Sequence, residues 1–366
     1  MKVTRLSAIH YRNLKELEIY PQEGVNIIYG ENAQGKTNLL ESIWMFTGCR
    51  SFRGAKDAEL ISLKNEAARL EMDFYAEGRE QEATLLLDEK RHAVLNGIPL
   101  PSASKLMGEF RAVVFSPAHL SLVKEGPVQR RRFLDLALSQ LRPRYASLLS
   151  QYNRALAQRN ILLKDIAYHS ELMDTLAIWD ERLATLGAQI IYQRRSYVER
   201  MQESAVAFYH GLSRGREKLS LAYASSMEGH STEEIACEFS EKLLKNRVED
   251  LKNGSTSVGP HRDDLEIYVD QLSARIYGSQ GQQRSCALSM KLSEAALIRE
   301  ITGEQPVALL DDVMSELDDS RQLHLLETIE GKVQTFLTTT TLEHVKDKMS
   351  VEAEIFYVEQ GHIKGE

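Results

Sequence analysis

One short segment, YGENAQGKTNLLESIWMF at residues 29–46, limits the folds open to this chain more than any other. Gly30, Gly35, Lys36 and Thr37 follow the spacing G-x-x-x-x-G-K-T, which belongs between a strand and a helix. The preceding residues, VNIIYG, are largely β-branched and apolar, which predicts a buried strand. Apolar side chains recur at helical spacing after Thr37, so the segment has the context that the motif requires.

The glycine-rich turn predicts a nucleotide site. Its backbone N–H groups can bind phosphate oxygens, and the N-terminus of the helix favours negative charge. In this pattern Lys36 binds the β- and γ-phosphates, and Thr37 places its hydroxyl on Mg²⁺. The expected nucleotide-binding residues are Gly30, Glu31, Asn32, Ala33, Gln34, Gly35, Lys36, Thr37 and Asn38.

Two carboxylates follow a second predicted strand. In PVALLDDVMSELDDSRQ, residues 306–322, the apolar run from Val307 to Leu310 ends at Asp311 and Asp312. A carboxylate there can hold the Mg²⁺ that Thr37 contacts, and its neighbour can orient or deprotonate an attacking water. We assign Asp311 to the metal and Asp312 to the water, so the expected catalytic residues are Asp312 and Lys36.

A third predicted strand, VQTFLTTTT at residues 333–341, follows a short helix. Strands that alternate with helices predict an α/β fold with a parallel sheet. In such sheets the phosphate loop lies at the carboxyl ends of the strands.

The middle of the chain is helical and amphipathic, with a break at Pro143 and then one helix of about 40 residues, or about 60 Å. We expect a helical arm domain at residues 129–248, inserted into an ATPase domain formed by residues 1–128 and 249–366. The arm carries arginine clusters at residues 129–132 and 194–195, with Arg142, Arg144, Arg154 and Arg159 nearby. Because the net charge is −8, nucleic-acid binding would need such a local patch. Salt bridges and partner surfaces are the alternatives, and Arg130 to Arg132 could instead be structural residues that hold the arm against the ATPase domain.

Three widely spaced cysteines without a C-x-x-C pair indicate a reducing compartment, and no apolar run has the length of a membrane span. We therefore expect a cytoplasmic protein. His261, in GPHRDD, could suggest a metal ligand or a base, but its place before a strand favours a structural or nucleotide-sensing loop.

A further helix start lies in IYGSQGQQRSCALSMKLSEAALI, residues 276–298, where Ser279 is a plausible N-cap and the helix end a second anion site. Together with the phosphate loop, LLDDV and SELD, this order resembles the ABC-type ATPase heads of SMC-like chromosome proteins. Within that group the chain resembles the RecF family of bacterial recombinational repair. The stretches that carry the resemblance are IHYRNLKELEI, VVFSP, RRRFLDLALSQL, VGPHRDDLEI and YGSQGQQRS, which span most of the chain.

The resemblance implies an ATP-driven homodimer that holds two ATP molecules between its copies. Ser279 and Gly281, with Gln282, would contact the γ-phosphate held by the partner copy, and Asp318 would line the same interface. Arg12 and Asn13 would lie near the nucleotide. The implied function is a slow, DNA-stimulated ATPase that binds gapped DNA at junctions of single and double strands. It would help to load recombinase there with RecO-like and RecR-like partners, with no membrane involved.

The chain departs from the wider ABC pattern in three places. VVFSP lacks a glutamine, Asp312 stands where glutamate is usual, and Thr338 and Thr340 occupy the region of a late histidine. Two other functions compete. A structural chromosome ATPase of the SMC type would need a much longer coiled coil, and a transporter subunit would need an LSGGQ-like signature.

Overall fold

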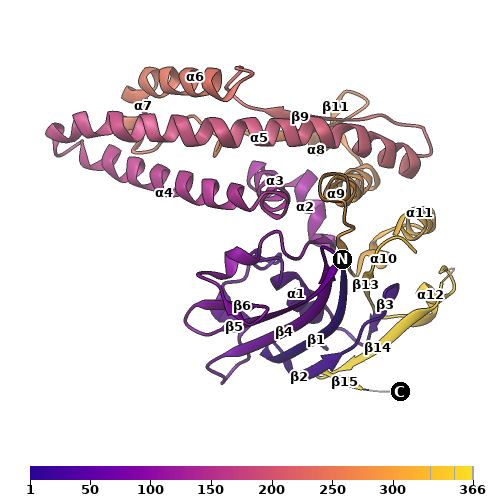
Figure 1. Ribbon diagram of the computed structural model, residues 1–366. Helices are drawn as coiled ribbons and strands as arrows, with labels where there is room; N and C mark the ends of the chain where they lie inside the picture. The colour runs from indigo at the N-terminus through magenta and orange to yellow at the C-terminus, as the bar shows by residue number, and fades with distance from the viewer. Residues whose placement is uncertain (330, 350, 365–366) are drawn as a thin grey trace. The chain divides into compact units, whose positions relative to one another are not determined.

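The structure is a computed structural model that describes residues 1–329, 331–349 and 351–364. The chain forms two compact units, coloured by residue number in Figure 1. Unit 1 comprises residues 1–120, 207–217 and 284–366, and unit 2 comprises residues 121–206 and 218–283. Within the described residues, no helix has the length and apolar character needed to cross a bilayer.

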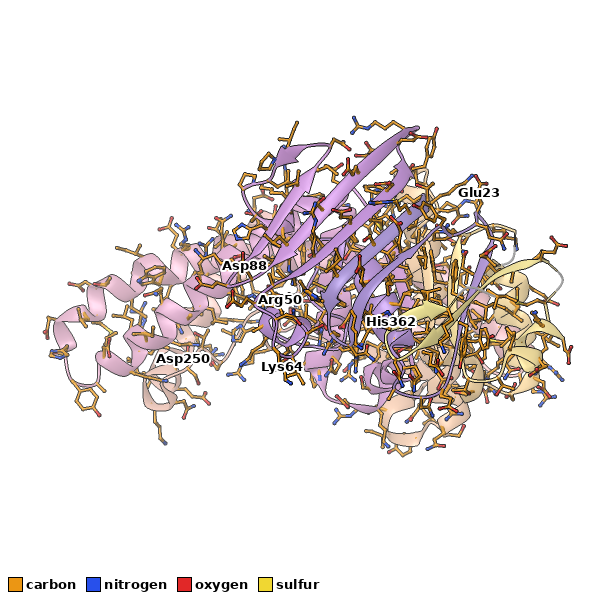
Figure 2. All side chains as sticks on the ribbon, turned by 90° about the horizontal axis from the view of Figure 1, so that it is seen from below. Glu23, Arg50, Lys64, Asp88, Asp250 and His362 are labelled. Carbon is orange, nitrogen blue, oxygen red and sulfur yellow. The ribbon has the colours of Figure 1, made fainter. Side chains whose placement is uncertain are left out.

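An antiparallel sheet forms the first layer of unit 1, with the strand order β2-β1-β4-β5-β6-β7. Buried and exposed residues alternate along β4, as expected for strands that cover a core with one face. The neighbouring strands lie side by side in Figure 2. Their bounds are β1 Lys2–Tyr11, β2 Leu14–Ile19, β4 Ala68–Ala76, β5 Arg79–Leu87, β6 Arg91–Leu95 and β7 Ile98–Pro99.

The second sheet of unit 1 has the order β15-β14-β3-β13-β12-β8, and all its pairs are parallel except β14–β15. Its central strands are buried throughout, which explains their continuous apolar runs. The three predicted strands of this sheet and their parallel pairing are confirmed, with small shifts at their ends. The bounds are β3 Val25–Tyr29, β8 Ala112–Phe115, β12 Val307–Asp311, β13 Thr335–Thr339, β14 Ala353–Glu359 and β15 His362–Lys364.

The α-helices that lie wholly in unit 1 are short. They are α1 Lys36–Met45, α10 Val313–Glu316, α11 Asp319–Ile329 and α12 Leu342–Lys346. Three long or linking helices, α2 Leu120–Lys124, α5 Met173–Ser213 and α9 Gln280–Thr302, contribute residues to both units. Single 3₁₀ turns are η1 Asp57–Leu60, η2 Ala103–Leu106, η3 Pro117–His119 and η4 Ser170–Leu172.

Unit 2 is built on a helical hairpin beside a small sheet of order β11-β10-β9. Helix α4 begins at Pro143, where the predicted break lies, and α5 has 41 residues, close to the predicted 40. Proline suits the first helical position because it lacks an N–H that would have no partner there. The other elements are α3 Pro127–Leu141, α4 Pro143–Asp165, α6 Thr232–Lys245, α7 Arg247–Asn253, α8 Ala274–Tyr277, β9 Leu219–Ala224, β10 Asp264–Val269 and β11 Leu272–Ser273.

The bounds of unit 2 differ from the predicted arm at residues 129–248. Residues 249–283, which the sequence led us to place in the ATPase domain, belong to unit 2. The reason is long-range pairing, since β10 pairs with β9 and buried Asp250 binds Arg159 of α4. Residues 207–217, at the end of α5 and beyond, belong instead to unit 1.

Candidate nucleotide-binding site

The turn between β3 and α1 has a backbone that requires glycine at both ends. Gly30 has φ 154°, and a Cβ there would lie 2.3 Å from the carbonyl oxygen of Val358. Gly35 has φ 121°, and a Cβ there would lie 2.9 Å from Leu14 Cδ2. Residues with a side chain rarely adopt such φ values. Glycine at both positions therefore allows the tight turn that exposes backbone N–H groups.

Lys36 lies folded back over this turn. Its ammonium donates to the carbonyl oxygens of Gly30, at 2.6 Å, and Glu31, at 2.8 Å. Burial lowers the pKa of Lys36, while the carboxylates of Asp312 and Asp311 oppose that shift. The loop therefore holds a largely buried cation at the place where a phosphate chain would enter.

Thr37 and Asp311 meet across the sheet edge, as the sequence predicted. The Thr37 hydroxyl donates to Asp311 Oδ1 over 2.7 Å, and the Thr338 hydroxyl donates to the same oxygen over 3.1 Å. Burial raises the pKa of Asp311, and these two hydrogen bonds oppose the shift. Thr338 had no definite role in the sequence analysis, whereas in the structure its hydroxyl binds the carboxylate of Asp311. Thr340 lies exposed on the loop that follows β13.

Asp312 has a left-handed backbone conformation, with φ 50°. Its N–H donates to Thr338 Oγ1 over 2.9 Å, which fixes the turn directly after β12. Aspartate is one of the few residues apart from glycine that tolerate this conformation. The turn thus presents a second carboxylate beside Asp311, on the side of Lys36.

Polar side chains from several segments of unit 1 hold the loop. Asn13 Nδ2 donates to the carbonyl oxygen of Ala33 over 3.1 Å, and Asn38 Nδ2 donates to Asn13 Oδ1 over 2.7 Å. Arg53 donates to Asn38 Oδ1 over 2.8 Å. On the other side, the β14–β15 turn donates two backbone N–H groups to Gln34. Sequence reasoning missed Arg53 and the β14–β15 turn because neither belongs to a motif.

Arg12, which was expected near the nucleotide, forms a bidentate ion pair with Glu41 of α1. The Glu41 side chain is fully buried and also accepts a hydrogen bond from Ser51. This pair anchors α1 one turn after the phosphate loop. No sequence motif marked Glu41, although a lone acid on the buried face of a helix signals an unseen partner.

Ser279, Gly281 and Gln282, which we call the signature residues, lie in unit 2. Ser279 caps α9, since its hydroxyl accepts from Gln282 N–H over 3.2 Å and Gln282 Oε1 accepts from Ser279 N–H over 2.7 Å. This confirms the predicted N-cap, and the Ser279 side chain is exposed. Gly281 lies in the first turn of α9. In unit 1, Asp318 caps α11 through Arg321 N–H and pairs with the Arg321 guanidinium.

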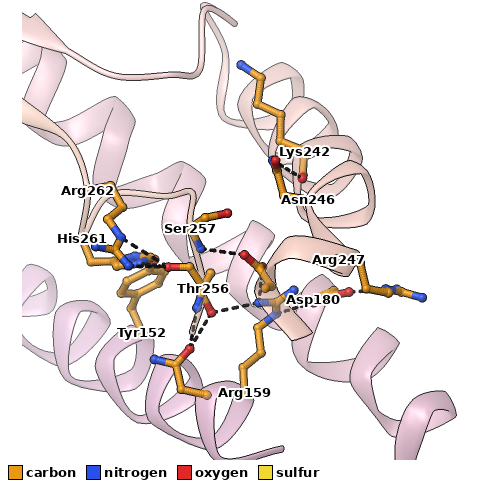
Figure 3. A network of polar contacts seen from close by, with 12 residues as sticks. Tyr152, Arg159, Asp180, Lys242, Asn246, Arg247, Thr256, Ser257, His261 and Arg262 are labelled. Carbon is orange, nitrogen blue, oxygen red and sulfur yellow. Dashed lines mark hydrogen bonds and ion pairs between the residues drawn. The ribbon is translucent and has the colours of Figure 1, made fainter. Parts of the chain in front are cut away.

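Several arm arginines that could have bound DNA are buried in unit 2 instead. Arg130 forms a bidentate pair with Asp264, and Arg194 forms one with Asp135. Arg159 is fully buried and binds Asp180 and Thr256, as Figure 3 shows, and it also binds Asp250. The expectation of DNA contact therefore fails for these three, because a buried, paired guanidinium cannot reach a phosphate. The alternative of salt bridges holds for these three, and the contact of Arg130 lies within unit 2, since its partner Asp264 belongs to the same unit.

His261 belongs to the same buried network in unit 2. Its Nε2 donates to the carbonyl oxygen of Thr256 at 3.0 Å, so its Nδ1 accepts from the Tyr152 hydroxyl at 2.8 Å (Figure 3). Burial lowers the pKa of His261 to about 4. The imidazole is thus neutral near pH 7 and fully used in packing, which agrees with the structural role favoured from the sequence.

Comparison with known proteins finds relatives that match this chain over its whole length. Residues 2–364 match the family model described as the RecF/RecN/SMC N terminal domain. The chain is 43% identical to the DNA replication and repair protein RecF of Enterococcus faecalis, over 100% of this chain and 99% of that one. It is 41% identical to RecF of Agathobacter rectalis, with the same coverage.

The solved structures agree. A structure of the recombination mediator protein RecF with ATP, described as part of the RecFOR pathway, superposes with TM-score 0.92 at 39% identity and covers 99% of this chain and 97% of that chain. An Smc head domain from Pyrococcus furiosus superposes with TM-score 0.56 at 15% identity, covering 99% of this chain and 95% of that chain, which shows the fold alone. The full-length matches, together with the ABC-type arrangement of the phosphate loop and its carboxylates, show that this chain belongs to the RecF family of the RecF/RecN/SMC group.

Proposed function

We propose that this chain is an ATP-dependent DNA-binding protein of recombinational repair that acts in the cytoplasm. In this proposal ATP closes a homodimer on gapped DNA at a junction of single and double strands. RecO-like and RecR-like proteins then help it to load recombinase. The observation that carries the proposal is the meeting of Thr37 with Asp311 beside the Lys36 turn, in a chain whose relatives are named for replication and repair.

The residues of the site fit ATP with Mg²⁺. Mg²⁺ prefers oxygen ligands, commonly one or two protein side chains together with substrate phosphates. Thr37 and Asp311 supply two such oxygens, and no cluster of three His, Cys, Asp or Glu among the described residues forms a metal site of its own. When bound, the ion would neutralise charge on the phosphates. Lys36 would leave the loop carbonyls for the β- and γ-phosphate oxygens.

Asp312 is the proposed base. Its carboxylate follows Asp311 directly, so it can orient a water near the terminal phosphate and accept its proton. Aspartate reaches less far than the glutamate of most ABC-type heads, which supports slow hydrolysis used as a switch. We also propose that Arg12 and Asn13 lie near the bound nucleotide. Arg12 would act on it indirectly, through its ion pair with Glu41 of α1.

The proposed dimer is head to tail, so that the signature of one copy contacts the ATP held by the other. Ser279 fits this role because its hydroxyl oxygen accepts a bond from Gln282 while its proton stays available for a phosphate oxygen. Gly281 lets the phosphate approach the helix backbone closely. Asp318 would line the same interface.

For contact with DNA we propose only those arm arginines that lie exposed on the surface. Arg142, Arg144 and Arg154 are exposed at the start of α4 and along it. From Pro143 to Lys164 this helix carries no Asp or Glu, so its surface is locally positive on an acidic protein. We propose that this surface contacts the phosphodiester backbone without base specificity.

A mixing experiment tests the composite ATP site. Ser279→Arg should leave ATP binding by the monomer intact but block the dimer, whereas Lys36→Ala should fail to dimerise because its weakened site stays largely empty at an ATP concentration that just saturates the parent. A mixture of the two variants contains heterodimers with one intact site. Analytical ultracentrifugation with ATP should therefore show partial dimer in the mixture and none with either variant alone. Normal dimerisation of Ser279→Arg would refute a role for the signature in trans.

A second experiment separates this function from that of a structural chromosome ATPase or a transporter subunit. Hydrolysis should rise with gapped DNA more than with duplex or no DNA, and binding should weaken steeply with salt. An ATPase rate that no DNA changes would refute the proposal.

A further inference from the structure

Three large apolar side chains lie exposed immediately before the signature helix. Leu272 is 57% exposed, Ile276 71% and Tyr277 68%. They come from β11 and α8, within one stretch of six residues. Single exposed apolar residues are common, but a group of this kind marks an interaction surface. We refer to Leu272, Ile276 and Tyr277 as the apolar flank.

The apolar flank is fixed to Ser279 by backbone contacts. Gln283, in the first turn of α9, donates its side-chain amide to the carbonyl oxygen of Ala274 over 3.0 Å. Gly278 N–H donates to the same oxygen over 3.2 Å, and a Cβ on Gly278 would lie only 2.4 Å from it. Glycine therefore allows the close turn between α8 and α9. The flank and the signature form one preorganised segment, which lowers the entropy cost of binding.

Charge indicates what this segment binds. Arg275 lies exposed between Leu272 and Ile276, so the apolar flank carries a positive charge on its surface. The nucleotide side of the proposed dimer has the opposite character. Glu31 is exposed in the phosphate loop, whereas Asp318 already pairs with Arg321 of its own chain. Arg275 beside the apolar flank thus complements Glu31 beside the site of a bound triphosphate.

We infer that the apolar flank is an anchor by which one copy of this chain packs against the nucleotide-binding unit of a second copy when ATP is bound. The inference rests on the proposed ATP-driven dimer and adds to it a contact that does not involve the nucleotide. Tyrosine and arginine side chains often supply most of the binding energy of an interface, and the flank offers Tyr277 beside Arg275. ATP then completes an interface whose apolar part is already formed on each copy.

The test substitutes Ile276→Asp in the full chain and measures ATP-dependent dimerisation by sedimentation velocity over a protein concentration series. Because a two-fold dimer contains the contact twice, the dimer Kd should rise on the order of 100-fold. Tyr277→Ala, which introduces no charge, should raise it about tenfold. ATP binding by the monomer and the melting temperature should stay those of the parent.

The matched control is Ile178→Asp in α5, since Ile178 is 65% exposed in the same unit. It should dimerise with ATP as the parent does, and Ile276→Leu should restore most of the affinity. Parent-like dimerisation of Ile276→Asp, or equal weakening by Ile178→Asp, would overturn the anchor while leaving the ATP-driven dimer intact. A parent that stays monomeric with ATP would overturn the proposed dimer, and the anchor with it.

Discussion

Removal of the Arg159 guanidinium should destabilise unit 2 more than any other single arginine substitution on α4. Arg159 is fully buried, and its Nε lies 2.6 Å from Asp180 Oδ1 (Figure 3), while its Nη1 lies 2.7 Å from Asp250 Oδ2. Arg159→Met keeps the length and apolar stem of the side chain but leaves two buried carboxylates without this cation. Breaking a buried ion pair from one side costs about 3–5 kcal/mol.

The remaining contacts place the expected loss at the lower end of that range. Asp250 still accepts from Ser257 N–H at 2.9 Å, and Asp180 still pairs with Arg247 at 3.0 Å. We therefore expect the free energy of unfolding to fall by about 3 kcal/mol. With a urea dependence of about 2 kcal/mol per molar, the unfolding midpoint should fall by about 1.5 M.

Tryptophan fluorescence can follow unit 2 alone. The chain has two tryptophans, Trp44 in unit 1 and Trp179 in unit 2, so Trp44→Phe leaves one reporter. Trp179 packs against the cluster that contains Leu162 and Leu176. In this background Arg154→Met is the matched control, because Arg154 lies exposed on the same helix and its loss should stay within about 0.5 kcal/mol. Equal midpoints for Arg159→Met and Arg154→Met would refute the buried network as a source of stability.

Three further predictions concern the nucleotide site and the arm. Lys36→Ala should weaken ATP binding about 10–100-fold in isothermal titration, because a charged hydrogen bond contributes about 1.5–3 kcal/mol; unchanged affinity would refute the phosphate-loop assignment. Asp312→Asn keeps a side chain that tolerates φ 50°, so ATP binding should persist while hydrolysis falls at least 100-fold, and a parental rate would exclude Asp312 as the base. The free energy of unfolding of unit 2 should fall by about 2 kcal/mol when the pH is lowered from 7.5 to 5. The pKa of His261 is about 4 in the folded protein and about 6.5 in the unfolded chain, so the unfolded chain takes up the proton first as the pH falls. Urea midpoints of His261→Gln should lack this part of the pH dependence, and the same dependence as the parent would exclude His261 as its origin.

The strand, turn and helix around the phosphate loop could be predicted because their signals are local. The β-branched run before Gly30 and the apolar period after Thr37 each lie within a few residues of the motif that they support. Asp311 could be joined to Thr37, 274 residues away in the chain, because parallel strands bring their carboxyl ends to one edge. The parallel arrangement of the strands was therefore enough to predict that Asp311 and Thr37 lie close together.

The partners of the arm arginines could not be predicted in the same way. Arg159 and Asp250 are 91 residues apart, and Arg130 and Asp264 are 134 apart, with no motif or sheet edge that links them. A solvated arginine and a buried one look alike in a helical sequence, since both are single charges among apolar neighbours. For the same reason, residues 249–283 could not be assigned to unit 2 from their composition.

The GPHRDD segment shows how this ambiguity affects a functional interpretation. Its histidine could suggest a metal ligand or a base, yet His261 binds Tyr152, and the neighbouring Asp264 binds Arg130. Asp263 accepts a hydrogen bond from the Tyr223 hydroxyl at 2.8 Å and is almost fully buried. The segment before Ser279 differs, because its side chains Leu272, Ile276 and Tyr277 are apolar and exposed. We therefore expect contact with a second copy at this exposed apolar segment. The charged GPHRDD motif instead stabilises the packing of unit 2.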